Sequence, residues 1–411
     1  MIPAQHEFEA GKDTTEMSQK KILLKLGGRK HLGEERWRDV LDLFDEIYSF
    51  CSYAEPSHVW EIPSEKAYCD VFPKTSLNHL FLRVINKFKR SGSFSWICAF
   101  SLTVLRILNR SYLSKIRAVE GASVLCSYGD YDNSDFIFCL CKNAIRQPVV
   151  RAYKETRPEY NYLEYTAMKS ADKIVLFDVE LKKFLEKKYG NDFFSGKEVM
   201  VGYDENALPS CILNGIHYQD KLSASDGKVH LVILSFRVDS SPNRSRDQAR
   251  YYYIDVIKEM MAAGVVVHLH CAQYNDDNGI NRYKELQDEN PGMFYMEKAL
   301  AMKHSSTTEE WIDSCEILSR YDAGLLHNIM DESSVSEFDR INIPHRFFAY
   351  EAAHVAPILK RGENVVLGRM FEEKRCGFTY DTFKELPEIL DADIEYYTPS
   401  YKDYLKAIFE L

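Results

Sequence analysis

The sequence predicts an α/β protein made of two domains, each a parallel sheet covered by helices. Two observations lead to this prediction. Short apolar strands alternate with helices in residues 20–205 and again in residues 228–395, and a stretch rich in turn-forming residues, 206–227, separates the two patterns as a linker. Strands and helices that alternate at this spacing form parallel sheets with right-handed crossovers. We therefore expect two Rossmann-like domains that face each other across a cleft.

Length and composition restrict the possible functions. A chain of 411 residues is long enough for two or three domains. Its net charge of −10 argues against general nucleic-acid binding, which needs a basic surface. The ten cysteines are scattered without metal-site spacing, so reduced thiols in a cytoplasmic protein are expected. Residues 1–19 are polar and are expected to form a disordered leader rather than a signal peptide.

The first domain begins with the apolar strand 21–26, followed by two glycines and a charged helix over 34–48. After the segment 81–118, the predicted strands are 123–126, 148–153 and 173–177, and the predicted helices are 135–146, a helix ending at 170, and 179–189. Two acidic residues, Asp130 and Glu155, come directly after the first two of these strands. Loops at the carboxyl ends of parallel strands are where α/β proteins bind ligands.

Residues 81–118 differ from the rest of this acidic chain. They contain eight basic residues, several aromatic residues and no acidic residue. The apolar run 96–105 is too short to cross a bilayer, which needs about 20 residues. A basic, aromatic helix pair is typical of a surface that lies on anionic lipid. The alternative is a buried helix pair whose long basic side chains reach the solvent.

The second domain repeats the alternation. Its predicted strands are 229–235, 265–270, 293–295, 323–327 and 356–360; its helices are one ending at 263, 283–288, 308–320 and 344–354. Pro344 suits the first turn of a helix, where its missing N–H has no partner to lose. Residues 396–411 read as an amphipathic helix, which we expect to pack back on the first domain.

The run PHRFFAYEAAHVAPIL, residues 344–359, resembles the nucleotide-sugar segment of GT-B glycosyltransferases, especially family 4 and related enzymes. The basic helix-start residue of that family corresponds to Arg346, and its tyrosine to Tyr350. The first glutamate of the family's pair is absent, the second position holds Ala349, and the nearest carboxylate, Glu351, lies two residues later. The pieces EYTAMKSADKIVLFD (164–178) and ILNGI (212–216) are also similar to sections that close the first domain in GT-B enzymes.

This resemblance implies a glycosyltransferase that takes its sugar from a nucleotide-sugar bound by the second domain. Arg237, just after that domain's first strand, is expected to hold the donor diphosphate, because arginine binds phosphate through two parallel hydrogen bonds. The other expected donor contacts are Arg346, Glu351 and Arg361. Neither a metal nor another cofactor is expected.

The first domain is expected to bind a glycan or lipid-linked glycan acceptor, in cell-surface polysaccharide synthesis at the inner face of the membrane. Asp130 and Glu155 are the candidate catalytic bases, and the sequence does not distinguish between them. It also does not indicate the sugar, the nucleotide or the stereochemical outcome. The alternative function is a catalytically inactive GT-B-like scaffold in a glycan-assembly complex, which the incomplete glutamate pair favours.

Other motifs carry less information. Asp130-Tyr131-Asp132 matches the metal-binding Asp-x-Asp of GT-A glycosyltransferases, but two α/β units fit GT-B better and such triplets are common in acidic chains. Residues 275–279 lack the spacing of a calcium loop and read as a turn. The three consecutive tyrosines 251–253 read as helix-packing residues. No phosphate-binding glycine loop, hydrolase elbow or zinc-protease motif occurs.

Overall fold

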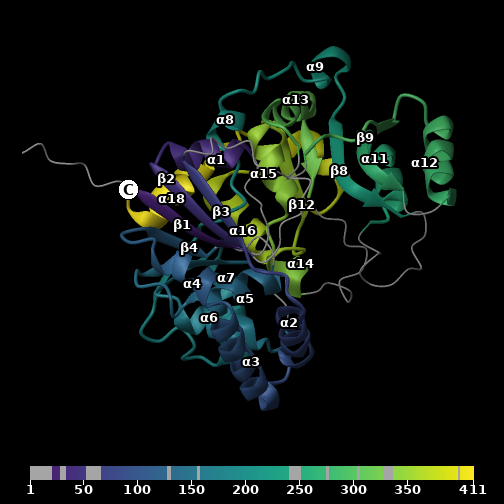
Figure 1. The fold of residues 1–411 in the computed structure, drawn as a ribbon. Helices are drawn as coiled ribbons and strands as arrows, with labels where there is room; N and C mark the ends of the chain where they lie inside the picture. Colours follow the sequence, from purple (N-terminus) through teal and green to yellow (C-terminus); the bar gives the residue numbers. More distant parts are fainter. Residues whose placement is uncertain are drawn as a thin grey trace, which may run out of the picture.

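The computed structural model describes residues 21–27, 34–51, 66–126, 131–154, 158–239, 251–274, 277–302, 306–326, 337–396 and 399–411. These residues form two parallel sheets (Figure 1). The first has seven strands in the order β3-β2-β1-β4-β5-β6-β7, and the second has six in the order β10-β9-β8-β11-β12-β13. The predicted α/β class with two Rossmann-like domains is confirmed.

The first domain contains these elements in chain order: β1 Ile22–Gly27, α1 Glu34–Leu41, β2 Glu46–Cys51, β3 Ala67–Val71, α2 Ser76–Phe88, the 3-10 turn η1 Gly92–Phe94, α3 Ser95–Leu108, α4 Arg110–Arg117, β4 Ser123–Cys126, α5 Tyr131–Cys141, β5 Val149–Tyr153, α6 Tyr162–Ser170, β6 Lys173–Leu176, α7 Val179–Tyr189 and β7 Glu198–Val201. Both faces of this sheet are covered, because Leu23 and Ile47 belong to one buried cluster and Leu24 and Phe50 to another.

One predicted helix of the first domain was wrong. The helix expected over 34–48 ends at Leu41, and residues 46–51 form β2, which pairs with β1 from Ile22↔Glu46 to Gly27↔Cys51. Ile47 and Phe50 of β2 are three residues apart and are buried on opposite faces of the sheet. A segment that is buried on both faces favours a strand over a continued helix. Strands β3 and β7 were also missed, because each is a short edge strand with a weak apolar pattern.

The second domain follows two short linker helices, α8 Ser210–Leu213 and α9 Ser223–Asp226. Its elements are β8 His230–Val238, α11 Ile254–Ala262, β9 Val266–Tyr274, α12 Asp277–Glu289, β10 Phe294–Glu297, α13 Thr308–Leu318, β11 Ala323–Leu325, α14 Glu337–Ile341, α15 His345–Ala352, β12 Ala356–Lys360, α16 Val365–Lys374, β13 Phe378–Tyr380, η3 Phe383–Glu385, α17 Leu386–Ile389 and α18 Tyr401–Phe409.

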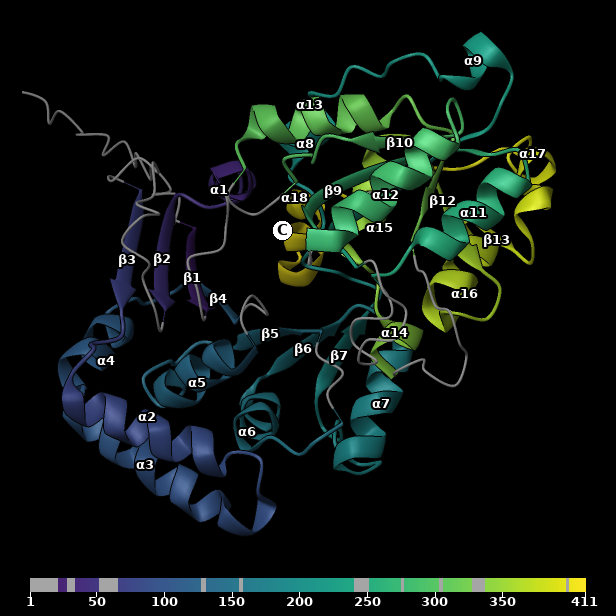
Figure 2. The same cartoon turned by 90° about the vertical axis from the view of Figure 1, so that its right-hand side faces the viewer.

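The hydrophobic core joins the two domains. One buried cluster runs from the first sheet and helices α2 to α7 through linker helix α8 to α13, α15 and α16 of the second domain. A second cluster fills the α11 side of the second sheet. The last helix, α18, packs on the first domain, where Tyr404 and Leu405 contact the cluster that contains Leu23 and Val40 (Figure 2). The domains are therefore held together by apolar contacts as well as by the linker.

Helices α2 and α3 lie side by side at the end of the first domain that is farthest from the second domain (Figure 2). Cys98 of α3 contacts the Ile85 carbonyl of α2, and the Phe88 and Phe94 rings are 5.5 Å apart. Among the described residues, no single helix is long and apolar enough to cross a membrane. Gly92–Leu108 and Arg110–Arg117 pass that test of length and composition only as a pair, which is bent by 81°.

Candidate functional site

Arg237 lies at the carboxyl end of β8, next to the last residue of the strand, Val238. Ser235 Oγ donates a hydrogen bond to the Arg237 carbonyl at 2.6 Å, which fixes the strand end. The guanidinium carbon of Arg237 is 4.1 Å from the centre of the Tyr251 ring. The Nε of Arg237 is buried and has no hydrogen-bond partner among the described residues. A buried N–H without a partner costs about 1–3 kcal/mol, so this group would gain from an anionic acceptor.

Arg346 is the second residue of α15, whose N-cap is Pro344. Its Nη1 donates a long hydrogen bond, 3.4 Å, to the Tyr253 hydroxyl. Burial opposes the charge of Arg346, but the neighbouring Tyr253 and Tyr350 hydroxyls outweigh burial and raise the pKa of the guanidinium above its usual value. Tyr251 acts on Arg346 in the same direction. Arg237 and Arg346 therefore meet the same short run of tyrosines.

Tyr350 fixes α15 on the sheet. Its hydroxyl accepts a hydrogen bond from the Leu234 N–H of β8 at 3.0 Å and lies 3.3 Å from the Leu325 carbonyl of β11. Its ring lies against Gly324, where an added Cβ would come within 2.6 Å of the ring. Because Tyr350 and Arg346 are four residues apart on one helix, they share a face. The tyrosine thus holds the helix turn that carries Arg346 close to the ends of β8 and β11.

The turn that follows α15 has an unusual backbone. His354 has φ 53°, which lies in the left-handed region. It belongs to the run 344–359 that resembles the GT-B segment. Its ring stacks on Tyr218 of the linker at 4.0 Å and on Tyr396 at 4.6 Å. These two rings hold a conformation that a non-glycine residue adopts rarely.

Glu351 is not brought together with the two arginines. It lies five residues after Arg346, about 140° around a helix with 3.6 residues per turn. Its side chain is 1% exposed. Cys376 and Tyr396 are among its neighbours. Burial raises the pKa of the Cys376 thiol to about 12, and the Glu351 carboxylate is the second cause. Burial also raises the pKa of Tyr396, again with Glu351 as the second cause. The expected contact of Glu351 with the donor ribose stays a prediction.

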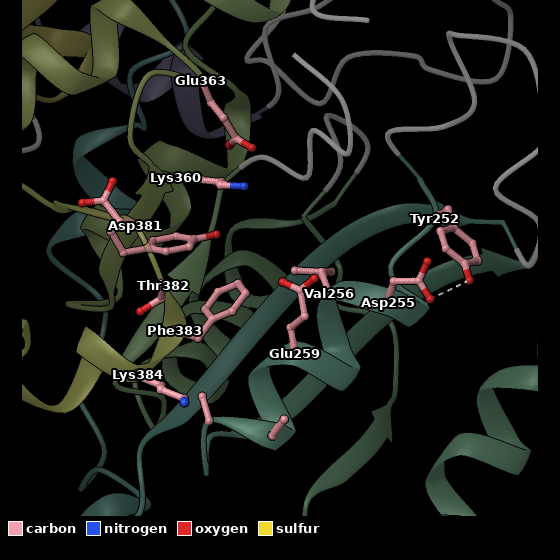
Figure 3. Close-up of a pocket in the computed structure, with 13 residues that line it drawn as sticks. Tyr252, Asp255, Val256, Glu259, Lys360, Glu363, Asp381, Thr382, Phe383 and Lys384 are labelled. Atoms are coloured by element: carbon pink, nitrogen blue, oxygen red, sulfur yellow. Dashed lines mark hydrogen bonds between the residues drawn. The ribbon is translucent and has the colours of Figure 1, made fainter. Parts of the chain in front are cut away.

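Arg361 lies apart from the Arg237 cluster. It follows β12, is exposed, and its Nε donates to both Asp381 oxygens at 3.1 Å. Asp381 lines a cavity of about 520 Å³ between α11 and the β13–η3 segment (Figure 3). The polar and charged lining residues are Tyr252, Asp255, Glu259, Lys360, Glu363, Tyr380, Asp381, Thr382 and Lys384. Neither Arg237 nor Arg346 lines this cavity. The two arginines therefore do not indicate that the donor binds there.

The predicted catalytic bases, Asp130 and Glu155, lie outside the described residues. The strands that precede them, β4 and β5, end at Cys126 and Tyr153. No group of three or more His, Cys, Asp or Glu side chains within the described ranges is arranged to hold a metal ion. The Asp-x-Asp triplet at 130–132 begins outside those ranges.

Three residues that the sequence did not assign to a site belong to this region. Tyr251 and Tyr253, read as packing residues, contact Arg237 and Arg346, while Tyr252 turns to the neighbouring cavity. Lys154, after β5, reaches from the first domain to the loop before α15. The tyrosines could have been found from their position: three aromatic hydroxyls directly after a basic loop that follows a strand. Lys154 had no such signal, because its partners are 50 and 189 residues away.

Comparison with known proteins was informative only at the level of structure. No protein-family model matches the sequence, and no curated protein matches it. The chain is similar to a solved α,α-trehalose-phosphate synthase (UDP-forming) from Burkholderia vietnamiensis, with TM-score 0.52, 11% identity, and coverage of 95% of this chain and 96% of that one. An E. coli structure described as trehalose-6-phosphate bound with UDP-2-fluoro glucose gives the same values. The protein therefore has the GT-B glycosyltransferase-like fold that the sequence resemblance implied.

Proposed function

We propose that this protein is a glycosyltransferase that uses a nucleotide-sugar donor, and that Arg237, Arg346 and the N-terminus of α15 hold the donor diphosphate. The observation that carries the proposal is the buried Nε of Arg237, which has no hydrogen-bond partner in the part of the chain that the structure describes, in a cluster that also contains the cationic Arg346. Within the described ranges no side-chain hydrogen bond caps the start of α15, so its first N–H groups can also meet an anion. The similar GT-B structures add support at the level of fold.

These groups suit the chemistry of glycosyl transfer. A bond forms between the acceptor oxygen and the anomeric carbon, the bond from that carbon to the phosphate oxygen breaks, and the nucleoside diphosphate leaves with the electron pair. Negative charge therefore grows on the diphosphate, where Arg237 and Arg346 stabilise the transition state more than the bound donor. The acceptor proton passes to a carboxylate, for which Asp130 and Glu155 stay the candidates. Because two guanidinium groups supply the positive charge, the proposal includes no metal ion.

Thermal unfolding with a panel of nucleoside diphosphates tests this proposal. A ligand that binds only the folded state stabilises it by about 2.7 kcal/mol at one hundred times its Kd. We expect at least one diphosphate to raise the Tm of the wild-type protein, and the Arg237→Ala variant to lose most of that increase. The matched control is Arg361→Ala, which removes an exposed arginine from the same domain. A wild-type Tm that responds to no nucleotide would contradict donor binding.

A second function is favoured by one observation. The position of the family's second glutamate is Ala349, which is fully buried, and Glu351 is buried beside Cys376 and Tyr396. A GT-B-like scaffold that has lost glycosyl transfer would show this pattern. Nucleotide binding without turnover of any nucleotide sugar would favour a regulatory form of this scaffold. Turnover of a donor, either to an acceptor or to water, would exclude it.

The finer part of the proposal is that the acceptor is a glycan or lipid-linked glycan used in cell-surface polysaccharide synthesis, and that the protein works in the cytoplasm on an anionic membrane. The membrane part is supported by exposed apolar side chains on α2, η1 and α3, which together we call the exposed apolar face. Its members are large apolar side chains, at least 45% exposed: Leu77, Leu80, Phe94, Trp96, Phe100, Ile107 and Leu108. Trp96, Phe100 and Ile107 recur at helical spacing, so they line one side of α3.

Basic residues flank this face, although fewer than the sequence indicated. Arg106 is turned inward, where its Nε donates to the Leu140 carbonyl at 3.2 Å. Lys115 forms an ion pair with Asp70 at 2.8 Å. Arg83, Lys87 and Arg90 of the α2 region are exposed, and they are the residues that would meet lipid phosphates. Aromatic insertion and basic attraction together are typical of a peripheral membrane surface.

Vesicle sedimentation tests the membrane part. We expect binding to anionic vesicles that falls with salt and that is lost when Trp96 and Phe100 are both replaced by Ser. The matched control replaces the exposed Tyr295 and Phe236 of the second domain by Ser. Binding that ignores lipid charge, or that survives the Trp96 and Phe100 changes, would exclude this face as the membrane surface.

A further inference from the structure

Lys154 connects the two domains through polar contacts at a buried position. It is the first residue after β5, and 7% of it is exposed. Its Nζ donates to Asp204 Oδ2 at 2.6 Å and to the Ile343 carbonyl at 3.0 Å. Asp204 belongs to the segment that leads from β7 to the linker, while Ile343 belongs to the second domain. One ammonium group thus contacts the first domain, the approach to the linker and the second domain.

Aromatic rings of both domains surround the same ammonium. Its nitrogen is 5.4 Å from the centre of the Phe177 ring in the first domain and 5.8 Å from the Phe348 ring in α15. Both distances are within the range of cation–π attraction. The contacts on the second domain are all at the start of α15: Ile343 immediately precedes the N-cap Pro344, and Phe348 is two residues after Arg346.

Burying an ammonium group between two surfaces has a high cost in desolvation free energy. Removing it from water carries a penalty that its partners repay only with good geometry, and apolar residues of similar size often stabilise such an interface as well. What the ammonium adds is direction, because two of its three N–H bonds have a defined acceptor. Here the acceptors fix the carboxyl end of β5 relative to the loop that begins α15.

We propose that Lys154 is a positioning residue that couples the placement of the first domain to the N-terminus of α15. When the two domains sit together as in this structure, Lys154 holds the Ile343 carbonyl and orders the first turn of α15, which carries Arg346. The catalytic consequence rests on the proposed function: a donor would meet an ordered Arg346 only when the acceptor domain is in place.

The chain offers a matched control at the same domain boundary. Arg369 of α16 donates to Asp178 at 2.6 Å and lies 3.5 Å from Glu180, both at the start of α7. These contacts also join the second domain to the first, and the partners of Arg369 lie at the start of α7 rather than on α15. Loss of either pair weakens the boundary, whereas only loss of Lys154 should affect α15.

The experiment compares Lys154→Met with Arg369→Met by hydrogen exchange and nucleotide binding. In Lys154→Met we expect the amides of residues 345–348 to exchange faster by about 2- to 30-fold. This range corresponds to the usual coupling energies of about 0.5–2 kcal/mol through packed networks. In Arg369→Met these amides should exchange as in the wild type. Asp204→Asn keeps Lys154 and weakens its anchor, so it should give a smaller effect in the same residues. It also serves as the test if Lys154→Met does not fold.

Nucleotide binding separates this inference from the proposed function. If the wild type binds a nucleoside diphosphate, Lys154→Met should bind it more weakly and Lys154→Arg should restore part of the affinity. If the wild type binds none, the proposed function fails, while the exchange data still decide the coupling. Unchanged exchange at 345–348 in both Lys154→Met and Asp204→Asn, or an equal change in Arg369→Met, would overturn the role of Lys154.

Discussion

Arg237 and Arg361 occupy comparable positions in the second domain but differ in their surroundings. Each lies at the carboxyl end of a strand of the same sheet, Arg237 on β8 and Arg361 just after β12. The side chain of Arg361 is 57% exposed and its Nε is satisfied by Asp381. Arg237 has a buried Nε without a partner among the described residues and is covered by Tyr251.

The difference separates an arginine with a carboxylate partner from one whose Nε has no partner among the described residues. A guanidinium that already has a carboxylate loses that partner when it binds an anion, so its net gain is small. A partly buried guanidinium with an unsatisfied N–H gains both the charge interaction and the missing hydrogen bond when it binds an anion. The same strand-end position in the sequence therefore predicts two different roles once the partners are known.

The largest expected effect is that of Arg237→Ala. Donor turnover should fall by about 10²–10³-fold in kcat/KM, as when a single transition-state donor is removed, while the free energy of unfolding changes by less than about 1 kcal/mol. Arg237→Lys should recover only part of the activity, because a point charge does not form the paired hydrogen bonds. Kinetics with several nucleotide sugars, together with urea unfolding, provide the measurement. Activity within a few-fold of the wild type would show that the phosphate is held elsewhere.

Arg346→Gln should have the next largest effect. It removes a cation in the first turn of α15 and should weaken nucleoside diphosphate binding by about 1.5–3 kcal/mol, the usual value for hydrogen bonds to charged groups. Titration calorimetry measures the affinity directly. Tyr253→Phe is the control, because it removes only the hydroxyl that Arg346 contacts at 3.4 Å and should change the affinity far less. Equal losses in the two variants would mean that the tyrosine, not the arginine, contacts the ligand.

Glu351→Ala tests the opposite face of the same helix. Because Glu351 is buried beside Cys376 and Tyr396, its truncation should lower the free energy of unfolding by about 1–3 kcal/mol, the usual range for disturbing a buried polar site. Nucleotide affinity should change little. This expectation differs from the ribose contact that the family resemblance implies. A fall in affinity at unchanged stability would restore that contact and move the donor toward this face.

Much of the architecture was accessible from the sequence, because it depends on local patterns. Apolar runs such as residues 229–235 and the N-cap at Pro344 identified the second domain's first strand and α15. Strand β2 was lost inside a predicted helix, since the charged residues before it continue a helical pattern and only pairing with β1 reveals the strand. Short edge strands such as β7 carry too few apolar residues to be recognised.

The site was less accessible, because it depends on distant partners. The sequence proposed Arg237 and Arg346 from their places after a strand and at a helix start, and the structure brings both against the same run of tyrosines. It could not show that Tyr251 covers Arg237, or that Asp381 already satisfies Arg361, since both facts depend on how the chain returns to the sheet. It also proposed a ribose contact for Glu351 by resemblance, and that contact stays a prediction; the helical period turns this side chain about 140° away from Arg346.

The smallest expected effect is that of Arg361→Ala, and it is the most direct test of the comparison. An exposed ion pair contributes about 0–1 kcal/mol, so the variant should unfold almost as the wild type does. Nucleotide affinity should not change, because Arg361 does not contact the tyrosines that join Arg237 and Arg346 in the described structure. Asp381→Asn completes a double-mutant cycle and should give a coupling energy within the same small range. If Arg361→Ala instead reduces nucleotide binding as strongly as Arg237→Ala, the donor reaches the end of β12 and displaces Asp381. The paired and unpaired arginines would then belong to a single, wider site.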